Sequence, residues 1–311
     1  MNSNPTSSMP DIAAGSVDVS GRIDWVGMSN IALILQVPLA DGSEQSVRAS
    51  ADVYVNLNRP DVRGVHMSRM FLLLDQFSQK SRLTPQANSA LLDSLLDSHE
   101  DLSDAVSVTF RFDLLLRRPA LISDNSGWRE YPVELKVERR PDGRVRSELQ
   151  LQITYSSTCP CSQALARTHI REQFNEQFGG GAPVDIERIG EWLESSPKWA
   201  SAHSQRSEAD VRLRLDEGAQ SYNFEELIEG LENTLGTPVQ TAVKREDEQE
   251  FARLNGENPL FVEDASRRLG AHLRGVEGID GFWLRVQHYE SLHAHDAIAV
   301  LAHNYGEPPT R

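Results

Sequence analysis

The two cysteines are the residues whose type and spacing point most directly to chemistry. Cys159 and Cys161 are the only thiols in 311 residues, and Pro160 separates them. A strand-like run over residues 149–155 leads into them and a helix-like run over residues 163–178 follows, so they lie at a strand-to-helix junction, where sites are commonly built. Pro160 fixes its own φ and holds the two side chains in a rigid relation. The partial positive charge of a helix N-terminus favours the thiolate, the form that binds metal or attacks carbon.

The cysteine pair alone leaves its role open, because Cys-x-Cys is a weak metal signal and both residues also fit as small apolar fillers. Further chemistry-bearing side chains gather in four segments, at residues 202–207, 244–248, 261–264 and 289–295. Thiolate, imidazole and carboxylate together are the ligands of catalytic zinc, which keeps an open position for water. Each segment also has a plainer interpretation, such as a solvated helix start at 244–248 or a first-turn acid at Glu263. The sequence alone does not establish whether these four segments and the cysteines lie close together in the folded chain.

Charge and composition exclude several classes of function. The net charge of −15 argues against nonspecific binding to nucleic acid or to an anionic membrane, although a local arginine cluster can still bind a nucleotide. No apolar run approaches the length that spans a bilayer. The polar start lacks the layout of a secretory signal, and with only two cysteines this predicts a cytoplasmic protein.

The order of elements predicts an α+β protein. Strands followed by paired helices and further strands occur twice, which indicates two tandem units of antiparallel sheet with helices on one face. The expected strands cover residues 16–28, 31–39, 45–57, 105–116, 131–139, the run into Cys159, 207–215, 281–289 and 297–302. The expected helices open near 66 and 85 and cover 163–178, 185–193, 223–235, 246–254 and 263–276. We expect a disordered tail at 1–16, a first unit at 17–155, and a second unit at 156–311 with an insertion near 166–200.

The motifs, taken in order, resemble those of a known family. They are Cys-Pro-Cys-Ser at 159–162, His-Ser-Gln-Arg at 203–206, Lys-Arg-x-Asp-Glu at 244–248, Asn-Pro-x-Phe-Val-Glu-Asp at 258–264 and Glu-Ser-Leu-His-x-His at 290–295, with supporting runs at 9–12, 21–27 and 64–69. This series is similar to the type IB GTP cyclohydrolases of prokaryotes. The resemblance implies the tunnelling fold, a homotetramer with active sites at subunit interfaces, and conversion of GTP and water to 7,8-dihydroneopterin triphosphate and formate. That reaction opens tetrahydrofolate biosynthesis and, in many bacteria, queuosine biosynthesis.

The resemblance also implies roles for individual residues. The ligands of a divalent zinc, manganese or iron ion would be Cys159, His203 and Glu248. Glu263 would grip the guanine edge, and the further active-site residues beside Cys159 would be Cys161, Glu290 and His293. Charge and closeness to the motifs suggest four triphosphate contacts: Arg69, Arg206, Lys244 and Arg245.

Several alternatives stay open at this point. His169, inside the expected insertion, is a rival to His203, which we prefer because its neighbours match the family motif. Another tunnelling-fold enzyme would use a cysteine covalently on a deazapurine or pterin substrate, with nicotinamide and no metal. A protein of a different class would bind a purine and leave it intact. The sequence does not fix the native metal, the tetramer, the role of the insertion or a disulfide between Cys159 and Cys161.

Overall fold

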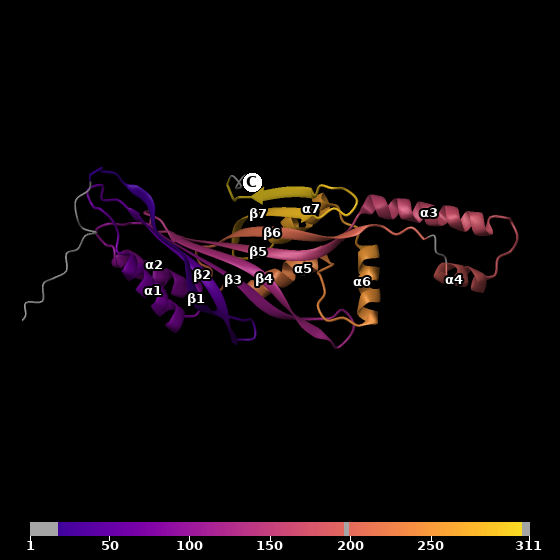
Figure 1. Ribbon diagram of the computed structural model, residues 1–311, viewed down its shortest axis with the longest axis horizontal. Coiled ribbons are helices and arrows are strands. Elements are labelled where there is room, and N and C mark those ends of the chain that lie inside the picture. The colour runs from indigo at the N-terminus through magenta and orange to yellow at the C-terminus, as the bar shows by residue number, and fades with distance from the viewer. Residues whose placement is uncertain (1–17, 196–198, 307–311) are drawn as a thin grey trace, which may run out of the picture.

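A single antiparallel sheet forms the frame of the molecule. The structure is a computed structural model that describes residues 18–195 and 199–306, so the tail predicted at residues 1–16 lies outside it. Within the described residues, eight strands pair in chain order, each antiparallel to the next (Figure 1). They are β1 (Ile23–Pro38), β2 (Glu44–Leu57), β3 (Val106–Pro119), β4 (Ser126–Arg139), β5 (Val145–Thr158), β6 (Ser204–Leu215), β7 (Ile279–His288) and β8 (Ala297–His303).

The helices fall between the strands in the predicted order. They are α1 (Met67–Lys80), α2 (Pro85–Asp97), α3 (Pro160–Phe178), α4 (Ile186–Ser195), α5 (Phe224–Leu235), α6 (Arg245–Glu257) and α7 (Val262–Leu273). The pair α1 and α2 packs on strands of the first half, whereas α5 and α7 pack on β5, β7 and β8. The predicted α+β class is confirmed. The boundary predicted at residues 155/156 falls within β5, and the division into two units stays a prediction.

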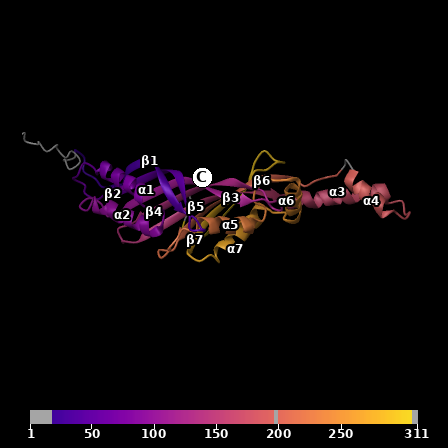
Figure 2. The same ribbon diagram turned by 90° about the horizontal axis from the view of Figure 1, so that it is seen from below.

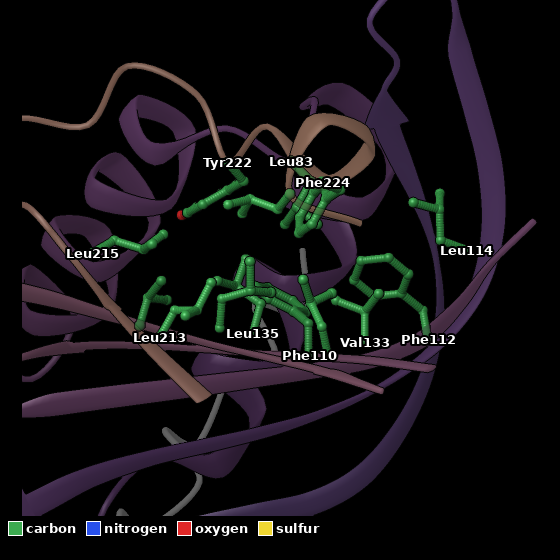
Figure 3. Packing of buried hydrophobic residues seen from close by; sticks show 14 of the residues in the cluster. Leu83, Phe110, Phe112, Leu114, Val133, Leu135, Leu213, Leu215, Tyr222 and Phe224 are labelled. Atoms are coloured by element: carbon green, nitrogen blue, oxygen red, sulfur yellow. The ribbon is translucent and has the colours of Figure 1, made fainter. Parts of the chain in front are cut away.

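The two halves share one core. Period-two burial places Leu149, Leu151 and Ile153 of β5 on the helix-covered face, as an antiparallel sheet with one covered face requires. Figure 3 shows Tyr222 and Phe224, at the start of α5, lying over strand residues of the first half. The rings of Phe224 and Phe112 meet edge-on with centroids 5.9 Å apart. One continuous apolar cluster therefore runs from β1 to β7.

The two strands predicted at residues 16–28 and 31–39 are wrong as separate elements, because β1 is one strand. Its pairing with β2 shifts register between Met28 and Ile31, where Asn30 has a φ of 57°. The N–H of Asn30 donates to Asp52 Oδ1 at 2.9 Å, which satisfies the group that the irregularity removes from the ladder. Asparagine is typical of turns because it tolerates the left-handed conformation, but here the strand continues past it.

Helices α3 and α4 project beyond the end of the sheet, opposite to α1 and α2 (Figures 1 and 2). They enclose a small aromatic cluster of their own, in which neighbouring ring centroids lie 5.0–5.8 Å apart: Phe174, Phe178, Trp192 and Trp199. Helices α3 and α4 together cover most of the expected insertion at 166–200. No helix in residues 18–195 or 199–306 has the length and apolarity needed to cross a bilayer.

A buried ionic network ties the first half to the second. Glu232 of α5 pairs with Arg129 of β4 and lies 3.5 Å from Arg118 of β3. The Tyr131 hydroxyl donates to the same carboxylate at 2.6 Å, and burial together with this carboxylate raises the pKa of Tyr131 to about 12. The network fixes the β3–β4 hairpin against α5.

Replacing Glu232 with alanine should lower the free energy of unfolding by about 3 kcal/mol or more, because it leaves the buried Arg129 without its counter-charge. Urea unfolding measures this change. Glu226→Ala, at an exposed position of the same helix, is the matched control and should change the value by less than about 0.5 kcal/mol. Equal effects of the two substitutions would contradict a stabilising role for the network.

Candidate functional site

Cys159 and His203 are held together by the backbone. Cys159 is the N-cap residue of α3, directly after β5, and His203 directly precedes β6. The Cys159 N–H donates to the His203 carbonyl at 3.1 Å, and the His203 N–H donates to Ser162 Oγ at 3.2 Å. Both cysteines are free thiols; Cys159 is half-buried and Cys161 is exposed. The structure thus brings together two of the three predicted metal ligands.

The connection after β7 also reaches His203. Ser291 Oγ lies 3.3 Å from His203 Nδ1, and the Tyr289 N–H donates to the Arg206 carbonyl at 3.2 Å. Glu290, next to Ser291, is half-buried, whereas His293 is exposed and stacks on His295 with centroids 5.1 Å apart. The predicted residues Glu290, His293 and Arg206 therefore belong to the same end of the sheet as the cysteines.

Glu263 approaches this end from α7. The N–H of Leu260 donates to the Thr158 carbonyl at 2.9 Å, which places the loop before α7 beside the residue that precedes Cys159. Glu263 itself lies exposed in the first turn of α7. Its carboxylate is therefore open to a ligand.

A buried pair that the sequence analysis did not identify lies near Glu263. Tyr155 OH and His288 Nε2 share a hydrogen bond of 2.8 Å, and both side chains are buried. Burial lowers the pKa of His288 to about 4, and the charge of Glu263 partly opposes that shift. Burial also raises the pKa of Tyr155. The alternation of β5 and β7 was the available signal, because it turns Tyr155 and His288 to the covered face.

Helix α6 meets the site with its C-terminal end. Asn255 Oδ1 accepts hydrogen bonds from Ser156 Oγ at 2.7 Å and Thr158 Oγ1 at 3.3 Å. Glu248 lies seven residues before Asn255, which puts it on the same helix face but about 10 Å away along the axis. No group of three His, Cys, Asp or Glu side chains is placed to hold a metal ion anywhere in the described part of the chain. The structure therefore does not bring Glu248 to Cys159 and His203 within one chain.

The remaining predicted cations lie apart from this cluster. Lys244 donates to Asp124 at 2.7 Å, and Arg245 is exposed beside it at the start of α6. Asp247, buried in the same turn, accepts from the N–H groups of residues 122 and 123 at 2.8 Å each and so fixes this end of α6 to the β3–β4 connection.

Two further candidates are placed by α1 and α3. Arg69 of α1 donates to the Ser98 carbonyl at 2.8 Å. Helix α1 lies at the end of the sheet opposite to α3 (Figure 1). His169 is exposed on α3, ten residues after Cys159 and so about 15 Å along the helix. His169 is thus far less well placed than His203 to share a ligand with Cys159.

The sheet and its helices define the class of protein as a tunnelling-fold protein. Solved uricases have the same fold: the uricase from Arthrobacter globiformis aligns with a TM-score of 0.50 at 7% identity, over 95% of this chain and 98% of that one. A hyper-thermostable AgUricase mutant aligns with a TM-score of 0.52 at 8% identity, over 92% of this chain and 94% of that one. At these identities the likeness shows the fold alone.

Sequence comparison gives the family within this class. The family described as type I GTP cyclohydrolase folE2 matches residues 9–299. A relative named GTP cyclohydrolase FolE2 from Pseudoalteromonas translucida is 46% identical over 94% of this chain and 96% of its own length. Another of that name, from Pseudomonas syringae pv. tomato, is 45% identical over 94% of this chain and 97% of its own length. The chain belongs to the FolE2 family of GTP cyclohydrolases.

The buried His288 should make stability fall as the solution becomes acidic. The unfolded chain takes up a proton near the ordinary histidine pKa of 6.5, whereas the folded chain takes it up only near 4, so stability is lost as pH falls between these values. The expected loss is about 3 kcal/mol. Urea unfolding across this range should show it in the natural protein. The double variant Tyr155→Phe/His288→Phe, which leaves no tyrosine hydroxyl without a partner, should lose less of its free energy of unfolding over the same pH range. An identical pH dependence in the variant would contradict the assignment of this loss to His288.

Proposed function

We propose that this chain is a GTP cyclohydrolase of the type IB division, which converts GTP and water to 7,8-dihydroneopterin triphosphate and formate. The reaction serves tetrahydrofolate biosynthesis and, through the same product, queuosine biosynthesis in the cytoplasm. The observation that carries the proposal is the convergence of Cys159, His203 and the Glu290–His293 segment at one end of the sheet in a chain of this family. The active assembly is a homotetramer with sites at subunit interfaces.

The proposed metal site starts from Cys159 and His203. A thiolate and an imidazole suit zinc, and with a carboxylate the set also accepts manganese or iron. When bound, a divalent ion lowers the pKa of its water and supplies hydroxide at neutral pH. We assign Glu248 as the third ligand. Because it lies about 10 Å along α6 from Asn255, it joins the set through a shift of α6 or from a neighbouring subunit.

Glu263 is the proposed guanine anchor. Its exposed carboxylate accepts two parallel N–H hydrogen bonds from the guanine edge. Adenine lacks this pair of donors, so the carboxylate would discriminate against it. Nearby, the buried His288 is neutral at physiological pH because burial lowers its pKa to about 4. The neutral imidazole therefore carries no positive charge that would compete with guanine for the Glu263 carboxylate.

Opening of the imidazole ring of guanine and release of its C8 carbon as formate need several proton transfers. We propose that these protons are carried by Cys161, Glu290 and His293. These residues lie at the same end of the sheet as Cys159 and His203. Arg206 is the cation at this end that would hold the triphosphate. Arg69, Lys244 and Arg245 act on the triphosphate only if a neighbouring subunit presents them, because they lie apart from Cys159 within one chain.

Cys159→Ala should lose bound metal as well as activity, because it removes a ligand atom. Metal content after gel filtration, measured by plasma mass spectrometry, should fall at least about tenfold. Cys161→Ala is the control, since Cys161 lies in the first turn of the same helix, two residues after Cys159, and is not an assigned ligand. Full metal content in Cys159→Ala would reassign the ligand.

Glu263→Ala should weaken GTP binding by about 100-fold, the loss expected for two charge-assisted hydrogen bonds. Isothermal titration with GTP measures this change under conditions without turnover. The neighbouring Asp264, which pairs with Arg267 at 3.0 Å, provides the control variant Asp264→Ala and should bind GTP normally. Unchanged affinity in Glu263→Ala would exclude the guanine-anchor role.

A further inference from the structure

A buried chain of polar side chains ends on the His203 imidazole. Gln205 Oε1 accepts a hydrogen bond from His203 Nδ1 at 2.9 Å. On its other side, the Gln205 amide donates from Nε2 to Ser157 Oγ at 2.9 Å. Ser157 Oγ in turn shares a hydrogen bond of 2.8 Å with Ser207 Oγ. Gln205 is 8% exposed, and both serines are fully buried.

The pairing of β5 with β6 builds this chain. Ser157 pairs with Gln205 and Tyr155 pairs with Ser207, so all four side chains point to the helix-covered face. This face is otherwise packed with apolar side chains, as Leu149, Leu151 and Ile153 show along β5. A polar group placed there is costly unless it is hydrogen-bonded. In the structure the Gln205 amide lies between Ser157 and His203, with its NH2 group toward Ser157 and its oxygen toward His203.

The orientation of the amide decides which nitrogen of His203 carries the proton. An amide oxygen only accepts hydrogen bonds, so Nδ1 must donate and the neutral ring keeps its lone pair on Nε2. Ser291 Oγ, 3.3 Å away, also faces Nδ1 rather than Nε2. Metal-binding histidines commonly donate their second nitrogen to a carbonyl or carboxylate, which fixes both tautomer and ring orientation.

We infer that Gln205 is a positioning residue that holds His203 with Nε2 free to bind the metal ion. The inference rests on the proposed function, because it takes His203 as a ligand. Gln205 acts through His203 and touches neither substrate nor metal. It gives a role to the third residue of the His-Ser-Gln-Arg motif.

The tautomer can be measured in the natural protein without any variant at Gln205. In metal-free protein labelled with ¹⁵N at its nine histidines, the His203 signals are assigned by their loss in His203→Asn. At alkaline pH, where imidazoles are neutral, we expect a protonated Nδ1 and an unprotonated Nε2. A protonated Nε2 would overturn the inference.

Variants at Gln205 test the effect on metal binding. Gln205→Met removes the acceptor at similar size and should weaken zinc binding about 10- to 100-fold in a chelator competition, whereas Gln205→Glu keeps an acceptor and should stay within about threefold of the natural protein. Gln150→Met, on the opposite face of β5, is the control and should bind zinc normally. The unfolding temperature of each metal-free variant shows whether it folds. Equal losses in folded Gln205→Met and Gln205→Glu, or no loss in Gln205→Met, would overturn the inference.

These readouts separate the inference from the proposed function. Neither the tautomer nor zinc affinity needs GTP turnover. A protein that binds zinc through His203 and responds to Gln205→Met but forms no formate would refute the cyclohydrolase reaction and leave the role of Gln205 standing. A His203→Asn variant with unchanged zinc affinity would refute His203 as a ligand, and with it the role of Gln205.

Discussion

The register between β5 and β6 is the constraint on which the candidate site depends. The two strands pair continuously from Ser147 with Leu215 to Thr158 with Ser204. The residues directly beyond this last pair are Cys159 and His203, so the end of the ladder places these two residues opposite each other. A slip of one residue would turn every side chain of β6 to the other face, which would expose the core residues and bury the charged ones. The large apolar area on the covered face therefore sets the positions of Cys159 and His203.

The same register organises the surroundings of the site. Ser207 of β6 pairs with Tyr155 on one side and His288 on the other. The hydrogen-bonded chain that ends on His203 and the buried pair near Glu263 are thus neighbours on one face of the sheet. A rigid sheet carries these groups, whereas Glu290 and His293 stand on the connection after β7 and Glu263 on a helix end. Of the groups in the proposed site, Glu290 and His293 thus lie on a loop, whereas Gln205 and the two serines of its hydrogen-bonded chain lie on strands.

Much of the fold followed from local patterns in the sequence. Thr84 and Pro85 indicated the start of α2, and the structure shows Thr84 Oγ1 accepting from the Ala87 N–H at 3.2 Å. The apolar stripe at Phe224–Leu235 predicted α5 correctly. The continuity of β1 through Asn30 did not follow from local patterns, because Asp52, which accepts from the Asn30 N–H, lies on the next strand.

The site was harder to predict than the fold. The order of motifs drew attention to Cys159 and His203, but only the strand register shows that they lie opposite each other. Gln205 stood inside a recognised motif, yet its role depends on Ser157 from another strand. Glu248 stands in another matching motif, and its distance from the cysteines along α6 depends on how that helix meets the sheet. Pairings between distant segments are set by tertiary packing, which spacing along the chain does not encode.

The most direct test of the proposed reaction is an assay of chelator-stripped protein incubated with GTP, with and without added zinc or manganese. Formate release and pterin fluorescence after oxidation are read in the same sample. We expect both to appear only when a metal is present. Bound GTP that yields neither product with any of these metals would contradict it.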